Sequence, residues 1–195
     1  MELNDEYWSN RYLMHQTGWD LHQASPPICA YIDQWTDTHS RVLIPGCGNA
    51  YEAEYLLQKG FTNITLLDLS AVIVAKLKNH FSGRGIEVIH ADFFGHKGVY
   101  DLILEQTFFC ALPPHLREAY CSKMHSLLSP GGRLSGVLFN KLFQGGPPFG
   151  GTLDEYQLLF SKNFEIHTMA PCYNSIAPRA GAEVFIILGK YGKTL

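Results

Sequence analysis

The sequence lacks the features that would indicate a nucleic-acid or membrane partner. It has no run rich in lysine or arginine, and its 15 basic residues are outnumbered by 18 acidic ones, for a net charge of −3. Because binding to nucleic acid depends mostly on neutralising phosphates, we expect no nucleic-acid partner. The apolar runs fall well short of the roughly 20 residues that a membrane-spanning helix needs, so we expect no membrane partner either.

The sequence has no cysteine pair at CxxC spacing. The five cysteines are at positions 29, 47, 110, 121 and 172, an odd number that argues against a disulfide framework and a zinc site. The nine histidines add no metal-ligand pattern, so we expect no metal. The residues after Met1 are polar and then aromatic, unlike the basic and then apolar pattern of a signal peptide. Together these features predict a cytoplasmic protein.

The rest of the composition is typical of a globular protein, with 46% hydrophobic and 17% charged residues in a chain of 195. This length suits a single domain, 1–195. Residues 1–40 are rich in aromatic side chains and are predicted to form a helical N-terminal lid segment. Residues 41–195 are predicted to form the core, in which short apolar runs alternate with helical patterns. This alternation indicates βαβ units and a mostly parallel sheet.

Helices and strands can be placed along that core from periodicity and from Gly and Pro positions. The last two predicted strands have no helix between them, so we expect them to pair as an antiparallel hairpin at one edge of the sheet. A tight turn is expected at 129–132, and Ser70 is expected to cap a helix. The predicted strands are 42–44, 64–67, 88–90, 100–104, 133–139, 164–171 and 183–188, and the predicted helices are 50–59, 70–81, 114–128 and 153–160.

Two glycines and one acid stand at the ends of the first two predicted strands. Gly46 and Gly48 follow the first strand, and the second leads to Asp68. In an open α/β sheet, ligands bind beyond the carboxyl ends of the strands, where glycine permits close approach and a carboxylate can accept hydrogen bonds from a ribose. A dinucleotide and S-adenosylmethionine both suit this pattern. A dinucleotide site has a third glycine where this chain has Tyr51, which disfavours an NAD-dependent oxidoreductase.

Seven segments, in their order and spacing, carry a resemblance to a known family: YWSNRYLMHQTGWD, VLIPGCGNAYEAEYL, LLDLS, ADFF, EQTFFCALPPHLREAY, LLSPGGRLSGVLF and GGPPF. From Glu6 to Lys190 the sequence resembles the thiopurine S-methyltransferase-like family of thiol and halide methyltransferases, within the class I S-adenosylmethionine-dependent methyltransferases. The resemblance implies an α/β, Rossmann-like fold: a seven-stranded, mostly parallel sheet with an antiparallel last strand and helices on both faces. It also implies S-adenosyl-L-methionine as cofactor, S-adenosyl-L-homocysteine as product, and a monomer.

The resemblance further implies roles for single residues. Gly46 and Gly48 are expected near the amino-acid part of the cofactor, and Asp68 at its ribose. Asp92 is expected to accept a hydrogen bond from the adenine amine, with Phe93 beside the ring. The full expected cofactor-binding set is Trp8, Tyr12, Trp19, Gly46, Gly48, Asp68, Asp92, Phe93 and Gln106.

Trp8, Tyr12 and Trp19 are the aromatic residues of the predicted lid that bear on the cofactor. Trp8 and Tyr12 lie four residues apart and would share one face of a helix. Aromatic faces attract cations by about 0.5–2 kcal/mol each, and the cofactor carries a sulfonium cation. We therefore expect these rings to cover the cofactor and exclude water. The alternative is that they only anchor the segment to the core.

No residue is assigned to catalysis with certainty, but several are candidates for the pocket of a small-molecule acceptor. His22 is a candidate proton acceptor, and Phe149 lies in a glycine-flanked loop of the kind that closes over sites. An ordinary core position is the alternative for Phe109, and a solvated surface position for Arg179. The neutral Gln106 disfavours a thiopurine-type anionic acceptor, because thiopurine-methylating members have an arginine there. The candidates are Trp19, His22, Phe109, Phe149 and Arg179.

The predicted reaction is direct methyl transfer to a small thiol or a related chalcogen nucleophile. A free thiol has a pKa near 8.5, so part of it is already thiolate at neutral pH, and neither a strong base nor a covalent intermediate is required. A halide or thiopurine methyltransferase and a catalytically silent cofactor-binding protein are the alternatives.

Overall fold

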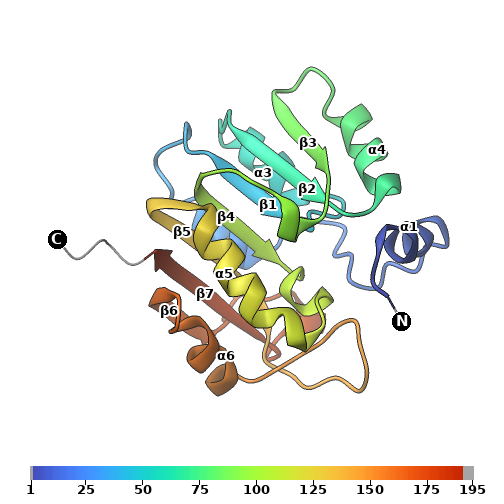
Figure 1. Cartoon of the computed structure of the whole chain (residues 1–195). Helices are drawn as coiled ribbons and strands as arrows, with labels where there is room; N and C mark the ends of the chain where they lie inside the picture. Colours follow the sequence, from blue (N-terminus) through green and yellow to red (C-terminus); the bar gives the residue numbers. More distant parts are fainter. Residues whose placement is uncertain (1, 191–195) are drawn as a thin grey trace.

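The computed structural model describes residues 2–190. Its centre is one seven-stranded sheet with the order β3-β2-β1-β4-β5-β7-β6 (Figure 1). The strand β7 runs antiparallel to both of its neighbours, and the other pairs are parallel. The predicted fold class and the edge hairpin are therefore confirmed. The strands are β1 (Val42–Pro45), β2 (Ile64–Asp68), β3 (Ile86–His90), β4 (Tyr100–Gln106), β5 (Leu128–Phe139), β6 (Phe164–Pro171) and β7 (Glu183–Lys190).

Helices cover both faces of the sheet because side chains alternate along each strand. In β1, Val42 and Ile44 pack in one apolar cluster, while Leu43 packs in the other. The first cluster also contains side chains from α2 (Pro26–Ile32), α3 (Tyr51–Gln58) and α4 (Ala71–His80). The second contains side chains from α5 (Arg117–Leu127) and α6 (Leu153–Phe160). The two clusters thus form the core on either side of the sheet.

Two local predictions differ from the structure. The helix expected at 114–128 begins later, because the short 3₁₀ turn η3 (Pro114–Leu116) precedes α5. The turn expected at 129–132 lies inside β5. There Leu128 pairs with Tyr100 and Arg133 with Leu102, so the residues between them loop out as a bulge.

The N-terminal segment divides into two parts. In α2, Ile28 and Ile32 are buried in the core. In contrast α1 (Asp5–Leu13) has no fully buried residue and lies beyond the carboxyl ends of the strands, next to α4 (Figure 1). The carboxylate of Asp5 accepts a hydrogen bond from the Ala71 N–H, at the start of α4, at 2.9 Å. Of this segment, the residues that line the cavity described below all lie between Glu2 and Gln23, so α2 takes no part in it.

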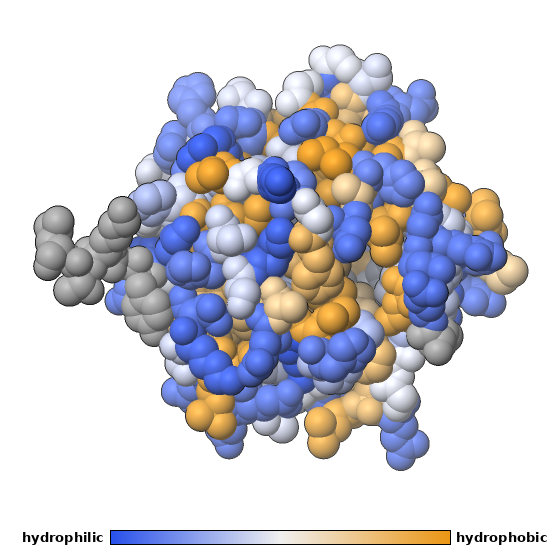
Figure 2. Space-filling model, viewed as in Figure 1, coloured by the Kyte–Doolittle hydropathy of each residue, from blue (hydrophilic) through white to orange (hydrophobic). Residues whose placement is uncertain are grey.

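Within residues 2–190, every helix is too short or too polar to cross a bilayer. On the face seen in Figure 1, apolar residues gather toward the middle and are bordered by hydrophilic ones (Figure 2).

Candidate active site

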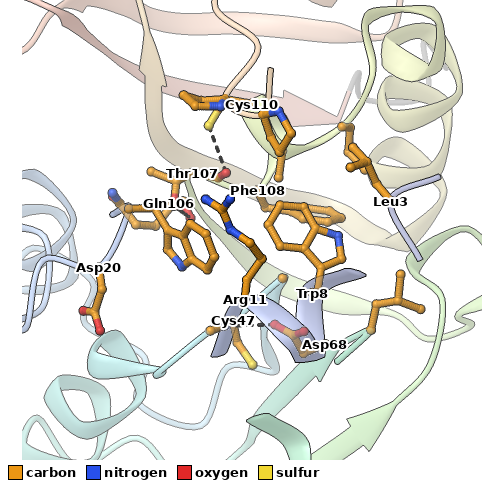
Figure 3. A pocket seen from close by; sticks show the side chains of 18 of the residues that line it. Leu3, Trp8, Arg11, Asp20, Cys47, Asp68, Gln106, Thr107, Phe108 and Cys110 are labelled. Carbon is orange, nitrogen blue, oxygen red and sulfur yellow. Dashed lines mark hydrogen bonds between the residues drawn. The ribbon is translucent and has the colours of Figure 1, made fainter. Parts of the chain in front are cut away.

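A cavity of about 1000 Å³ opens at the carboxyl ends of β1, β2 and β4 (Figure 3). We call its strand side, made of residues 46–48, 68 and 106–108 with the buried Glu105 behind them, the floor, and its N-terminal side, made of residues 2–23, the roof. Ten of the residues expected from the sequence line this one cavity: Trp8, Tyr12, Trp19, Gly46, Gly48, Asp68, Asp92, Phe93, Gln106 and Arg179.

The floor begins with the turn after β1. Gly46 and Gly48 have φ values of +57° and +51°, which favour glycine. A Cβ on Gly46 would collide with the Phe108 ring, and one on Gly48 would lie 3.2 Å from the hydroxyl oxygen of Tyr12. The chain therefore passes through a space that only glycine leaves open.

Asp68 ties this turn to the end of β2. One carboxylate oxygen accepts a hydrogen bond from the Gly48 N–H at 3.0 Å, and the other accepts from the Ser70 N–H at 2.9 Å. Burial raises the pKa of the Asp68 carboxyl, while these N–H donors lower it. The Ser70 hydroxyl caps α4 through the Ile73 N–H, as predicted. Asp68 is therefore held in place by the backbone on both sides.

The end of β3 places Asp92 and Phe93 at the side of the cavity. The Asp92 carboxylate accepts from the Phe94 N–H at 3.0 Å, which starts the short η1 (Phe93–Gly95). The Phe93 ring is 5% exposed and meets the Phe108 ring edge to face, with centroids 5.0 Å apart. Phe93 therefore offers an apolar wall, and Asp92 an exposed acceptor.

The end of β4 is shaped by the buried carboxylate of Glu105. It accepts hydrogen bonds from the Phe108 N–H at 2.8 Å, the Phe109 N–H at 2.9 Å and the Tyr120 hydroxyl at 2.7 Å. Burial raises the pKa of Glu105 to about 7. Within the same bend, Thr107 has a φ of +62°, which is unusual for a β-branched residue. Glu105 thus holds a strained turn that presents Phe108 to the cavity.

Gln106 lies at the same strand end, and both polar atoms of its side chain are buried without a hydrogen-bond partner in the structure. A buried amide without partners costs about 1–3 kcal/mol. Because Gln106 lines the cavity, a bound ligand is the natural partner for this amide.

The roof presents aromatic rings and one cation. The rings of Trp8 and Trp19 meet at 5.5 Å, and those of Tyr12 and Trp19 at 5.8 Å, both edge to face. The guanidinium carbon of Arg11 lies 5.5 Å from the centre of the Trp19 ring. Burial, with Asp68 nearby, raises the pKa of the Tyr12 phenol far above neutrality, so this hydroxyl is protonated.

Arg179 lines the cavity but is already partnered. Its guanidinium donates to the Trp19 carbonyl oxygen at 2.8 Å and lies 3.3 Å from the carboxylate of Glu183. With 8% of its surface exposed, it is not the solvated arginine that was the alternative. It ties the roof to the start of β7.

Three expected acceptor-site residues do not line the cavity. The His22 side chain is 83% exposed and lies outside the cavity lining. Phe109 is fully buried among Tyr120, Tyr156 and other rings, so its alternative, an ordinary core position, holds. Phe149 is half-buried in its loop, where Pro147 and Pro148 border the cavity in its place.

Other lining residues were not expected as site residues. Asp20 is held by the Asn49 amide at 2.6 Å and the Tyr51 hydroxyl at 3.3 Å. Arg11 could have been found from its place three residues after Trp8, on the same helix face. The thiols of Cys47 and Cys110 also line the cavity, and burial raises the pKa of both well above the ordinary value. Both are therefore protonated and poor nucleophiles.

The fold and the cavity at the strand tips define the class as methyltransferase-like. The structure is similar to that of Burkholderia thailandensis 1,6-didemethyltoxoflavin-N1-methyltransferase, which was solved with S-adenosylhomocysteine, with a TM-score of 0.74 and 20% identity over 96% of this chain and 87% of that one. The family model described as "Thiopurine S-methyltransferase (TPMT)" matches residues 3–184. The chain belongs to this family, and the predicted family and enzyme class are confirmed.

Relatives support the same grouping. The chain is 29% identical to "Probable thiol methyltransferase 2" of Arabidopsis thaliana, covering 96% of this chain and 84% of the relative. It is 28% identical to "Thiopurine S-methyltransferase" of Vibrio parahaemolyticus, covering 81% of this chain and 82% of that protein.

Proposed function

We propose that this protein is an S-adenosylmethionine-dependent methyltransferase that methylates the sulfur of a small thiol, or a related chalcogen nucleophile. The observation that carries the proposal is the cavity itself: in a chain of this family, the glycine turn, Asp68 and the unpartnered Gln106 amide lie under a roof of aromatic rings. The names of the relatives, which refer to thiols and thiopurines, point to sulfur as the methylated atom.

The residues of the cavity suit the methyl donor. Gly46 and Gly48 leave room for its amino-acid part, Asp68 offers a carboxylate to its ribose diol, and Asp92 with Phe93 suit its adenine. The volume of about 1000 Å³ accommodates a ligand of drug size together with a small acceptor. When bound, the donor supplies a methyl group already activated by a sulfonium.

The protein itself therefore has to align the donor with the acceptor, remove water from both and enclose them. Alignment of two reactants can lower a barrier by roughly 7–11 kcal/mol. The Trp8 and Trp19 rings exclude water on the roof side, and Phe108 does so on the floor. The two cavity thiols are protonated, so the proposal uses no covalent enzyme intermediate. The nucleophilic atom is supplied by the acceptor molecule and not by a side chain of the protein.

Calorimetry tests the donor, and a panel assay tests the acceptor. Purified protein should bind S-adenosylmethionine and S-adenosylhomocysteine but not NAD. With labelled donor it should methylate thiols or hydrosulfide faster than halide or thiopurine acceptors. Absence of binding to either adenosyl compound would reject the proposal. Binding without turnover on any of these acceptors would favour a silent cofactor-binding protein.

The remaining expectations belong to the same proposal. We infer one methyltransferase domain over 1–195, acting as a cytoplasmic monomer on a small molecule and without nucleic acid. The net charge of −3 supports the last point. Light scattering of the purified protein measures its mass in solution. A dimer or larger assembly that carries all of the methyltransferase activity would contradict the monomer.

A further inference from the structure

Arg11 is a cavity-lining cation without a partner. It lies on the face of α1 that also carries Trp8 and Tyr12. Within residues 2–190 its guanidinium makes no ion pair and no hydrogen bond, and its Nε is buried. Its only described contacts are with the ring faces of Tyr7 at 6.0 Å and Trp19 at 5.5 Å. These rings hold the guanidinium without neutralising its charge.

Arg11 differs in this respect from the arginines that make ion pairs. Arg179 borders the same cavity, but its charge is balanced by Glu183 and it donates to a backbone carbonyl. Arg41, Arg84 and Arg117 likewise pair with carboxylates. Leaving the buried Nε of this half-buried guanidinium unpaired costs free energy, because that donor loses water without gaining an acceptor. Such a group is suited to an anion that arrives from outside.

The surroundings of Arg11 show where that anion would lie. In Figure 3 its guanidinium points toward the end of β4 that carries Gln106 and Thr107. The Gln106 amide is also buried without a partner. The carboxylates of Asp20 and Asp68, which face the cavity, already accept hydrogen bonds from the chain. Two unsatisfied groups that can donate hydrogen bonds thus border one region of the cavity.

The carboxylate of the donor is balanced by its own ammonium group, so its sulfonium leaves it with a net positive charge, which a free guanidinium in the same cavity repels unless a further anion lies near both. A nucleophile that carries negative charge has to approach the sulfonium and would fill this place. Resting on the proposed function, we propose that Arg11 is an acceptor-binding residue, which selects a nucleophile that arrives as an anion, such as a thiolate, hydrosulfide or thiocyanate. The Gln106 amide N–H₂ donates a second hydrogen bond to it.

This role has a kinetic signature. Arg11 stabilises the anion before the methyl group moves, so its loss raises the acceptor KM and leaves kcat nearly unchanged. A merely structural role would lower thermal stability or weaken binding of every ligand alike.

The test uses thiocyanate as a probe with the full chain saturated in S-adenosylhomocysteine, which has no methyl group to transfer. Calorimetry is run on wild type, Arg11→Met, Arg11→Lys and, as a control, Arg84→Met, whose arginine pairs with Glu54 at the surface. We expect Arg11→Met to weaken thiocyanate binding by about 10- to 100-fold, the effect of losing a hydrogen bond to a charged group. Arg11→Lys should recover part of it, and Arg84→Met should change nothing.

Affinity for S-adenosylhomocysteine is measured first and should stay within about two-fold in all variants. If Arg11→Met weakens that affinity as much as thiocyanate binding, Arg11 serves the donor's carboxylate and the inference is overturned. Unchanged thiocyanate binding, or none in wild type, also overturns it.

If wild type does not bind S-adenosylhomocysteine, the proposed function fails, and the same thiocyanate titration of the free protein still decides the role of Arg11. Arg11→Gln replaces Arg11→Met if the latter does not fold.

Discussion

The floor and the roof of the cavity are built in different ways. On the floor, the Asp68 and Glu105 carboxylates accept backbone N–H groups and fix the turns after β1, β2 and β4. On the roof, α1 has no fully buried residue, and its rings and Arg11 meet mostly other side chains. A floor fixed by backbone suits a ligand part that never varies, whereas a roof of side chains can be altered without disturbing the sheet.

The largest effect that would test this contrast is expected at Glu105, on the floor. Its folded-state pKa of about 7 lies above the ordinary 4.5, so the protonated carboxyl stabilises the fold fully below pH 4.5. That contribution is lost as the pH rises through 7. Relative to Glu105→Gln, which does not titrate, wild type should lose on the order of 3 kcal/mol of unfolding free energy between pH 4.5 and pH 8. Denaturant melts at several pH values measure this.

The exposed Glu118→Gln serves as the control for that experiment, because Glu118 lies at the surface beside Lys162. If the unfolding free energies of wild type and Glu105→Gln change with pH in the same way, the stability of the floor does not depend on a buried titrating carboxyl.

The next effect is expected at Asp68. Asp68→Ala removes a charged acceptor from the floor and should weaken S-adenosylhomocysteine binding by roughly 1–3 kcal/mol, as titration calorimetry would show. Asp92→Asn keeps an acceptor oxygen at an exposed position and should cost less. Equal losses from both variants would contradict the idea that the floor's backbone-held acid dominates recognition.

On the roof, Trp19→Leu should act on the cationic donor more than on its neutral product. Loss of the ring removes a cation–π attraction of about 0.5–2 kcal/mol, so affinity should fall for S-adenosylmethionine and much less for S-adenosylhomocysteine. Trp19→Phe, which keeps an aromatic face, is the matched control. If Trp19→Leu only lowers the melting temperature, the ring is an anchor and not a cation-binding face.

The smallest effect is expected at His22. Its exposed side chain does not line the cavity, so His22→Ala should change kcat/KM by no more than about two-fold. A tenfold loss in the acceptor assay, with unchanged stability, would return His22 to the list of proton acceptors.

Local pattern was enough to predict most of the fold. Apolar runs with flanking glycines placed the strands, and the missing helix before β7 indicated the reversed edge hairpin, because both signals lie within neighbouring residues. The errors came where residues distant in the sequence determine the local structure. The bulge in β5 depends on its pairing with Tyr100 and Leu102, and no feature of 129–132 alone shows which strand lies beside it.

The residues of the cavity divide in the same way, into those that local sequence predicts and those that depend on distant parts of the chain. The sequence by itself determined the glycine turn, the acid at the end of β2 and the aromatic rings near the N-terminus, since each is a matter of residue type at a fixed spacing along the chain. Only the tertiary structure decided that Phe109 enters the core while Phe108 lines the cavity, that Arg179 is neutralised by Glu183, and that Arg11 and Gln106 stay unpaired. Partners and burial depend on which segments meet in space, and that is set by packing across the whole sheet.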